Sequence, residues 1–579
     1  MRRSTPPFPL RSDKSSQLCS GSGPYTLTIL GQSRAITAQR LALTRSAPSP
    51  SVLVHTAPCS PAAMSEAASM NSSLKRCSPR VFTIALLMSL GIIAVYLDSR
   101  LAWNSLHTPT HVFHSAERSH VPPVPVQDTP HVEPEKLQMV RTLNAIAQNT
   151  SQPRGIVIPV YEPIVKLAAS LILELRTMGV DAPIEMPFCG DVTPQSQELL
   201  ASKAALGSIR FYDVCELAAA ATVEGDATRK VFCEDLDACQ TKFRSFDIKV
   251  MSVVFSKFEE FMMVDADTAF FVSPAVLWDS EKYKATGTLL MNDRIAHEIY
   301  FMAERVGGKG NVSFQHRFMS KFDPVPFRSL PTLEREKATL PNPAPVELKF
   351  EPSDYLFNSH SWNLRTGHQV DSSLMFWSKK KQPRATAILG SFKALTDVGS
   401  PPSYGDKELY FYAAELAETQ YSFSDHAIGA VGTDYHDNGP KNSTLCGDMA
   451  QVFPIKQASE DDVPLFYLNS DRVLHFKPEV EPVFYMKARM ADVYPGAFGE
   501  RRMECPFDIT GAQFSDAEAR HLTGRQRLHD LVIEWENIDQ DSASDPQTKE
   551  TKSSAVDGMV DEQMHQMRGA YRQVTTPNV

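Results

Sequence analysis

The pattern of apolar and polar positions predicts that ordered structure begins near residue 154 and that strands then alternate with helices. Short β-branched runs indicate buried strands, whereas apolar residues three and four positions apart indicate helices. The expected elements are a strand at 155–160, a helix at 164–178, a strand at 183–188, a helix at 197–206, a helix at 243–258 and a strand at 261–264. This alternation predicts an α/β fold with a mostly parallel sheet and helices on both faces.

The first 150 residues lack such a pattern except in one place. Residues 81–97 form an uncharged apolar run that is long enough to cross a membrane as one helix. Basic residues precede the run, which predicts a cytoplasmic N-terminus and a lumenal remainder. We therefore expect a disordered cytoplasmic tail at 1–80, a transmembrane signal-anchor at 81–97 and an extended stem at 98–150. A cleaved signal peptide is the alternative, but the run lies far from residue 1 and no Ala-x-Ala site follows it.

Charge and cysteine content narrow the function classes. The net charge is −10, and basic residues predominate only in the first 100 residues, so the acidic bulk of the chain is a poor partner for nucleic acid. An even number of cysteines follows the apolar run and suits disulfides in an oxidising lumen, with a pairing that the sequence leaves open: Cys189, Cys215, Cys233, Cys239, Cys446 and Cys505. Glycosylation sequons begin at Asn149, Asn311 and Asn442 on the same side.

The sharpest chemical signal is Asp265-Ala266-Asp267, which directly follows the apolar run 261–264. In a parallel sheet, ligands collect beyond the carboxyl ends of the strands. Carboxylates two residues apart lie on the same side of an extended strand, so both can approach one cation. Their hard oxygens suit Mn²⁺ or Mg²⁺, whose coordination water and substrate phosphates complete. The segment predicts a metal site that holds a diphosphate, although the same triplet also occurs in solvated loops that bind no metal.

The segment 249–268 resembles the metal-binding segment of GT-A glycosyltransferases, including glycogenin-like enzymes. Further segments resemble the fungal α-1,3-mannosyltransferase family, in order along the chain: 154–160, 274–279, 283–288 and 404–409. The resemblance implies a GT-A-like, Rossmann-type domain at 151–510 and a nucleotide-diphosphate sugar donor, usually GDP-mannose. It also implies transfer to a glycan acceptor with retention of the α configuration, by a type II Golgi membrane protein whose catalytic domain is lumenal.

The resemblance also assigns roles to residues in the matching segments. Donor contacts are implied for residues at the ends of expected strands and around the metal motif: Pro159, Val160, Tyr161, Lys249, Asp265, Ala266, Asp267 and Asp293. The implied metal ligands are Asp265, Asp267 and the late His475, whose imidazole favours Mn²⁺ over Mg²⁺. Asp406 and Asp371 are the implied catalytic carboxylates, although the segment around Asp371 matches the family only loosely.

Structural interpretations compete for several of these residues. Lys249 would also suit the exposed face of an amphipathic helix, and His475 would suit a core position between its apolar neighbours. Asp406 precedes a helical run at 409–416 and could cap it, which is worth about 1 kcal/mol. Asp293 follows an expected strand at 288–292, and a turn is its preferred interpretation.

Two further segments complete the picture. The run 379–381 consists of three lysines and is expected to be a solvated turn. The polar C-terminal tail at 511–579 is expected to be largely disordered after residue 538.

The sequence thus predicts a membrane-anchored, metal-dependent glycosyltransferase that takes mannose from GDP-mannose. A UDP-sugar donor is the enzymatic alternative, because the metal motif binds the diphosphate and not the base. A catalytically silent lumenal glycan-binding or scaffold subunit of a transferase complex is the alternative from another class, and the loose match at 369–373 keeps it open. No Gly-x-Gly-x-x-Gly, P-loop or Cys-x-x-Cys motif supports a dinucleotide enzyme, an NTPase or a structural zinc site.

Overall fold

The computed structural model describes residues 133–571 and residue 577, with gaps at 294–300, 309, 396, 398, 434–447, 459–462, 471–473, 475–482, 487–510, 542–543 and 572–576. These described residues belong to one compact unit, 123–579. The predicted cytoplasmic tail, the signal-anchor and most of the stem lie outside them. Within the described ranges, no helix combines the length and the apolar character that crossing a membrane requires.

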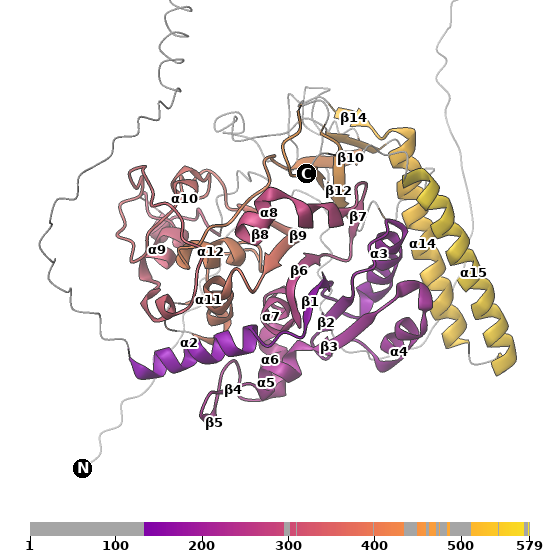
Figure 1. Ribbon diagram of the computed structural model, residues 1–579, viewed down its shortest axis with the longest axis horizontal. Helices are drawn as coiled ribbons and strands as arrows, with labels where there is room; N and C mark the ends of the chain where they lie inside the picture. Colours follow the sequence, from indigo (N-terminus) through magenta and orange to yellow (C-terminus); the bar gives the residue numbers. More distant parts are fainter. Residues whose placement is uncertain are drawn as a thin grey trace, which may run out of the picture. The chain divides into compact units, whose positions relative to one another are not determined.

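A six-stranded sheet with the order β3-β2-β1-β6-β9-β8 forms the centre of the unit (Figure 1). Its strands are β1 (Gln152–Val157), β2 (Ile184–Phe188), β3 (Ile209–Asp213), β6 (Phe258–Val264), β8 (Thr288–Asn292) and β9 (Val370–Ser378). The first four pair in parallel, whereas β9 runs antiparallel between β6 and β8. The predicted α/β fold with a mostly parallel sheet is therefore confirmed.

Both faces of this sheet are buried, which explains why its strands are apolar at successive positions. In β6, Phe261 and Met263 belong to one core cluster, whereas Met262 and Val264 belong to the other. The first cluster contains residues of α2 (Pro134–Ala147), α5 (Val214–Ala220), α7 (Asp247–Phe255), α11 (Pro383–Ala394) and α12 (Leu409–Leu416). The second contains residues of α3 (Val165–Thr177), α4 (Pro194–Ser202), α14 (Asp516–Gln540) and α15 (Pro546–Tyr571).

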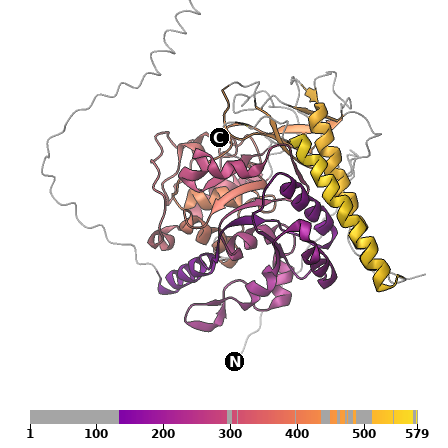
Figure 2. The ribbon, with the colours of Figure 1, turned by 45° about the vertical axis from the view of Figure 1, so that its right-hand side comes forward.

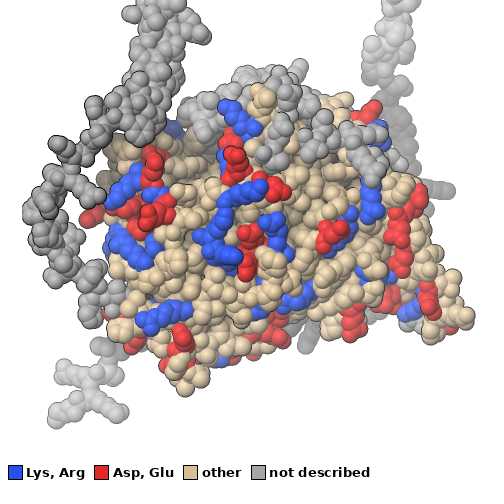
Figure 3. All heavy atoms as spheres, in the orientation of Figure 1, with Lys and Arg blue, Asp and Glu red and all other residues tan. Residues whose placement is uncertain are grey.

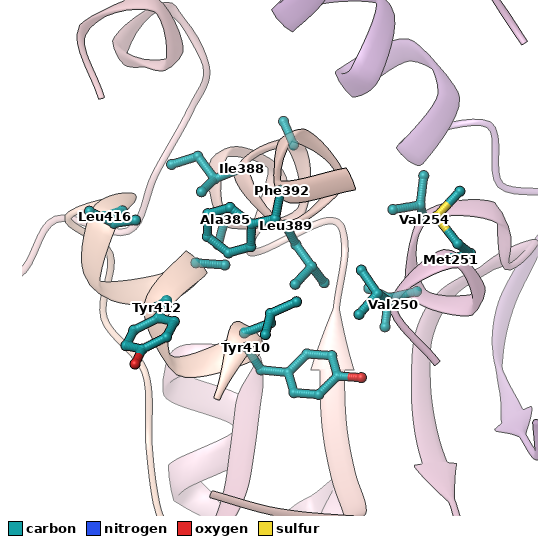
Figure 4. Packing of buried hydrophobic residues seen from close by; sticks show 14 of the residues in the cluster. Val250, Met251, Val254, Ala385, Ile388, Leu389, Phe392, Tyr410, Tyr412 and Leu416 are labelled. Atoms are coloured by element: carbon teal, nitrogen blue, oxygen red, sulfur yellow. The ribbon is translucent and has the colours of Figure 1, made fainter. Parts of the chain in front are cut away.

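Helices α7, α11 and α12 meet in a tightly packed part of the first cluster (Figure 4). Val250 and Val254 of α7, Ile388 and Leu389 of α11, and Tyr410 of α12 are each at most 1% exposed. Burying an aliphatic side chain of this size stabilises the fold by about 1.5–3 kcal/mol. This packing fixes the start of α12 and the loop that precedes it.

A second, antiparallel sheet has the order β14-β13-β10-β11-β12-β7. Its strands are β7 (Thr268–Phe270), β10 (Gly429–Thr433), β11 (Asp448–Val452), β12 (Leu465–Asn469), β13 (Val483–Met486) and β14 (Gly511–Gln513). Because β7 begins immediately after Asp267, the predicted metal motif is the connection between the two sheets.

The C-terminal region differs from the expected disordered tail. Ser515 and Glu518 form a capping box that starts α14, and α15 returns along α14 as the second arm of a helical hairpin (Figure 2). Leu528 and Trp535 of α14 and Val560 of α15 are at most 2% exposed and pack into the second core cluster. The prediction of disorder after residue 538 is wrong because α15 buries a sparse apolar stripe against its neighbours.

Shorter elements complete the unit: α6 (Leu236–Phe243), α8 (Glu281–Thr286), α9 (Phe314–Lys321), α10 (Asp354–Asn358), and the hairpin of β4 (Thr222–Val223) and β5 (Asp226–Lys230). Two disulfides join Cys189 to Cys215 and Cys233 to Cys239. Helix α2 starts at Pro134, within the range expected to be a stem, and buries Val140 and Leu143 in the core. The ordered unit therefore begins earlier than predicted.

Lys379 contradicts the expectation of a solvated turn at 379–381. Its side chain is fully buried, and its Nζ donates hydrogen bonds to the carbonyl oxygens of Ala147 (2.8 Å), Val254 (3.3 Å) and Ser256 (2.5 Å). These acceptors lie at or just past the ends of α2 and α7, where carbonyls have no intrahelical partner. The lysine thus joins two helix ends from inside the protein.

Candidate functional site

The Asp265-Ala266-Asp267 segment forms the turn between β6 and β7. The backbone N–H of Thr268 donates to the Asp265 carbonyl oxygen (3.1 Å), and that of Asp265 donates to the Ser373 carbonyl oxygen (2.9 Å). These bonds hold the turn at the carboxyl end of β6, where the sequence placed it.

A cavity of about 480 Å³ lies beside this turn. Its wall contains Pro159, Val160, Tyr161, Ile164, Leu167, Asp191, Ser245, Phe246, Ile248, Lys249, Asp265, Ala266 and Asp267. The segments after β1, β2 and β6 all contribute, so the cavity lies at the carboxyl edge of the parallel strands. Its volume is within the usual range for small-ligand sites, roughly 300–1,000 Å³. Seven of the eight predicted donor contacts lie on this wall, and Asp293 does not.

Lys249 lies in the first turn of α7 and forms an ion pair with the metal motif. Its Nζ is 2.6 Å from Oδ1 and 2.8 Å from Oδ2 of Asp265, and 3.8 Å from Oδ1 of Asp406. Burial alone would lower the pKa of Lys249, but the Asp265 and Asp406 carboxylates outweigh it and raise the pKa above its ordinary value. The ammonium therefore stays charged, and the interpretation of Lys249 as an exposed surface residue is wrong.

Asp406 is 1% exposed and accepts a hydrogen bond from the Tyr410 hydroxyl (2.9 Å). Burial and this adjacent carboxylate raise the pKa of Tyr410 well above its ordinary value, so its hydroxyl remains a donor. Helix α12 begins at Leu409 with Glu408 at the cap position and without a side-chain cap. Asp406 therefore does not cap α12, and its carboxylate faces Lys249 instead.

Asp371 lies at the start of β9, where the pairing with β8 is irregular. Its carboxylate is fully buried and accepts hydrogen bonds from Gln451 Nε2 (2.9 Å), the Tyr467 hydroxyl (3.1 Å) and the Ser373 backbone N–H (3.0 Å). Both Gln451 and Tyr467 come from the second sheet. The irregular strand start thus holds a buried acidic side chain that strands from both sheets surround.

The loop 403–408 links the remaining polar residues to this site. Lys407 Nζ is 2.6 Å from Asp293 Oδ2, whose side chain is 3% exposed. The buried Glu408 carboxylate accepts hydrogen bonds from the backbone N–H groups of Gln369 and Val370, 3.2 Å each. Asp293 is therefore half of an ion pair at the end of β8, a more specific role than the preferred turn interpretation.

The arrangement of charges fits a divalent cation. Asp267 lies on the cavity wall and its Oδ1 accepts a hydrogen bond from Asn469 Nδ2 (2.7 Å). Burial, with Asp406 and Asp371, raises the pKa of Asp265 against the opposing effect of Lys249. Three carboxylates, those of Asp265, Asp406 and Asp267, thus act on one ammonium, and a cation would relieve their mutual repulsion. Two hard carboxylates on a cavity wall form a partial ligand set for Mn²⁺ or Mg²⁺.

The predicted third metal ligand, His475, lies outside the described residues. Among the described residues, the only cluster of three potential ligands that lie within reach of one ion comprises Cys189, Asp213 and Cys215. The two cysteines are bonded to each other, so this cluster offers no thiolate for a metal.

The structure also adds residues that the sequence did not single out: Gln451, Asn469 and Tyr467 beside the aspartates, and Lys407, Glu408 and Phe246 around them. The sequence separations of Tyr467 and Asn469 from their aspartates are 96 and 202 residues, and no local pattern reports such contacts. Lys407 and Glu408 do lie in the segment 404–409 that resembles the family. Their two successive charges were the feature from which the sequence could have predicted a role for them.

The family model and the curated relatives that match this chain are all described as mannosyltransferases. A family model described as "Mannosyltransferase putative" matches residues 153–452. Among curated relatives, "Putative alpha-1,3-mannosyltransferase MNN14" of Candida albicans is 25% identical over 42% of this chain and 33% of its own length. "Alpha-1,3-mannosyltransferase MNT3" of Saccharomyces cerevisiae is 27% identical over 36% of this chain and 31% of its own length. The chain thus spans about a third of the length of these two relatives.

Solved structures give weaker matches. The apo structure of the WbbM bifunctional glycosyltransferase covers 47% of this chain and 39% of its own, with 12% identity and a TM-score of 0.26. A galactosyltransferase LgtC structure with donor and acceptor sugar analogues covers 47% of this chain and 73% of its own, with 11% identity and a TM-score of 0.25.

Proposed function

Because the chain belongs to the mannosyltransferase family whose model matches residues 153–452, we propose that it is a GT-A-like glycosyltransferase that transfers mannose from GDP-mannose to a glycan. The observation that carries the proposal is the Asp265-Ala266-Asp267 turn on the wall of a nucleotide-sized cavity. The parallel strands end at this cavity, which is the usual place for a nucleotide in such a sheet.

In the proposed donor complex, Asp265 and Asp267 would hold a divalent metal, with His475 as the proposed third ligand. When bound, such an ion would supply the positive charge that stabilises a diphosphate leaving group. Lys249 keeps Asp265 in place and adds a fixed positive charge next to the phosphates. Pro159, Val160 and Tyr161 after β1 line the same cavity and contact the nucleotide.

Asp371 and Asp406 are the proposed catalytic carboxylates. Tyr467 and Gln451 orient Asp371, while Tyr410 orients Asp406. One carboxylate at the reacting carbon and another on the sugar hydroxyls would support transfer with retention of the α configuration.

We further propose that the enzyme is a single-pass type II protein of the Golgi membrane with a lumenal catalytic domain. The two disulfides support an oxidising compartment, and the sequon residues Asn149 and Asn311 are exposed. On the face shown in Figure 3, Lys and Arg lie interspersed with Asp and Glu, which suits a neutral glycan better than nucleic acid.

A donor panel tests the proposal. The purified full-length protein is incubated with Mn²⁺, mannobiose and GDP-mannose, UDP-glucose, UDP-galactose or UDP-N-acetylglucosamine, and the products are separated by mass spectrometry. We expect mannosyl transfer that Asp267→Asn abolishes and that the exposed-site variant Asp279→Asn leaves intact. Transfer from a UDP-sugar alone would reassign the donor. A folded protein that uses none of these donors would favour the silent glycan-binding or scaffold subunit.

A further inference from the structure

Tyr404 is the centre of an aromatic cluster next to the cavity, which we name the Tyr404 cluster. Its ring centroid lies 5.4 Å from that of Phe301, 5.6 Å from that of Phe246 and 6.1 Å from that of His368. Despite these neighbours, Tyr404 is 48% exposed and Phe246 is 46% exposed. Large exposed aromatic side chains that gather in one place mark a binding surface.

The backbone around the cluster is held in uncommon conformations. Ser245, directly before Phe246, has a φ of 82°, and Phe301 has a φ of 55°. Both lie in the left-handed region, which non-glycine residues visit mainly where the surrounding structure enforces it, often at ligand sites. Gly405 has a φ of +67°, and a Cβ at this position would lie 2.6 Å from Cγ of Phe246. A glycine next to Tyr404 therefore lets the loop close onto Phe246.

The cluster continues the cavity in one direction. Phe246 belongs both to the cluster and to the cavity wall. Tyr404 directly precedes the loop residues Gly405 and Asp406, and Asp406 faces Lys249 inside the site. The Tyr404 cluster and the cavity thus share Phe246, and the loop that bears Tyr404 also reaches Lys249 on the cavity wall.

Strand order gives this surface a direction. Tyr161 and Asp191 follow β1 and β2, the metal motif follows β6, and His368 and Phe301 flank β9 and β8. A nucleotide sugar whose diphosphate lies at the metal motif must place its base on one side and its sugar on the other. Of the proposed catalytic carboxylates, Asp371 lies in β9, and Asp406 lies in the loop whose Glu408 accepts hydrogen bonds from the backbone at the start of β9. The sugar is therefore expected on the side of the Tyr404 cluster.

We infer that the Tyr404 cluster is the subsite for the acceptor, and that its exposed rings stack on the apolar C–H face of a terminal hexose. This inference rests on the proposed function. Aromatic side chains offer a flat apolar surface with a polar edge, and sites for polar ligands combine such surfaces with a few placed polar groups. The polar groups here are the His368–Glu408 pair, 3.3 Å apart, and the Lys407–Asp293 pair.

The first experiment measures acceptor binding without turnover. Saturation-transfer NMR is recorded for α-linked mannobiose with the full-length protein, in the presence of GDP and Mn²⁺. We expect binding by the wild-type protein and by Tyr404→Phe, which keeps the ring, and about tenfold weaker binding by Tyr404→Ala. Leu340→Ala, which changes another exposed apolar residue outside the cluster, should bind as the wild-type protein does. Equal binding by Tyr404→Ala and the wild type, or no binding by the wild type, would overturn the inference.

The second experiment separates the acceptor from the donor. Transfer from GDP-mannose is measured at varied mannobiose concentrations, and the Kd for GDP-mannose is measured by calorimetry. For Tyr404→Ala we expect the acceptor KM to rise about tenfold while the donor Kd is unchanged. A weaker donor Kd with an unchanged acceptor KM would assign the rings to the nucleotide and refute the inference. If the wild type does not bind GDP-mannose, the donor assignment fails, whereas the NMR result still decides the acceptor subsite.

Discussion

Replacing Arg525 by Met should weaken the attachment of the C-terminal hairpin to the body of the protein. Arg525 lies on α14 and is fully buried. Its Nε donates to Oε2 of the buried Glu174 on α3 (3.3 Å), and its guanidinium also donates to the Ser170 hydroxyl and to the Leu167 carbonyl oxygen. Methionine fills a comparable length of space but leaves Glu174 without its permanent positive partner.

The cost follows from the burial of both charges. Removing one partner of a buried ion pair typically costs about 3–5 kcal/mol, because the other charge stays buried and uncompensated. Glu174 keeps two other partners, since His521 Nε2 lies 2.8 Å from Oε1 and the Phe270 backbone N–H donates to Oε1 (3.3 Å). We therefore expect the lower end, about 3 kcal/mol. Because Phe270 belongs to β7, the loss also loosens the strand that follows the metal motif.

Amide hydrogen exchange measured by mass spectrometry resolves this local opening. A loss of about 3 kcal/mol should speed the exchange of α14 and α15 about a hundredfold, with β9 much less affected. Arg527→Met is the matched control on the same helix, because Arg527 pairs with Glu534 at 3.6 Å on the exposed surface. Equal acceleration by the two substitutions would refute the reasoning. Adding Glu174→Gln to Arg525→Met should restore part of the protection, since the uncompensated charge is then absent.

Three further predictions concern a buried lysine, a disulfide and the metal. Burial lowers the pKa of Lys379 to about 7, below the value of ~10.4 in the unfolded chain, so its contribution to stability is present above the unfolded pKa and is lost as the pH falls through about 7. Between these two pKa values, the free energy of unfolding measured with urea should rise with pH more steeply in the wild type than in Lys379→Met, by up to ~1.4 kcal/mol per pH unit. Lys380→Met, which changes an exposed lysine, should keep the wild-type slope. Replacing Cys189 and Cys215 by Ser opens a loop whose ends are 26 residues apart and should lower the unfolding free energy by about 3.5 kcal/mol; an unchanged urea midpoint would contradict this. Mn²⁺ at ~100 times its Kd should stabilise the protein by about 2.7 kcal/mol, seen as a higher melting temperature in calorimetry; an equal rise in Asp265→Asn would refute this ligand assignment.

The pattern of apolar residues predicted those helices and strands whose own residues are mostly apolar. The strand at 288–292 and the helix at 409–416 form with the predicted bounds, because their successive apolar residues are all buried on a regular backbone. The long C-terminal helices could not be predicted in the same way. Their apolar stripes are thin, and α15 is stabilised by contacts with α14 and α3 rather than by its own composition.

Sequence also located the centre of the site but not its surroundings. Asp265 and Asp267 are adjacent in the chain, so one motif revealed both, and the cavity beside them agrees with that prediction. The partners of Asp371 come from β11 and β12 of a second sheet, whose pairing brings together segments that are distant in the chain. Lys379 was misplaced for a related reason: a long side chain can reach buried carbonyls that its charged neighbours at 380 and 381 do not reach.

The two sheets together explain why the Asp265-Ala266-Asp267 turn is held rigidly. A turn that merely ended one strand would be free to move, whereas this turn is held on both sides. β6 pairs with β9 before it, β7 pairs with β12 after it, and Glu174 binds the backbone of β7 from α3. Because Arg525 holds Glu174 from α14, residues beyond the family match at 153–452 contribute to the rigidity of the motif. A chain shortened before α14 should therefore lose activity through the geometry of Asp265 and Asp267, even though every residue of the proposed donor site would still be present.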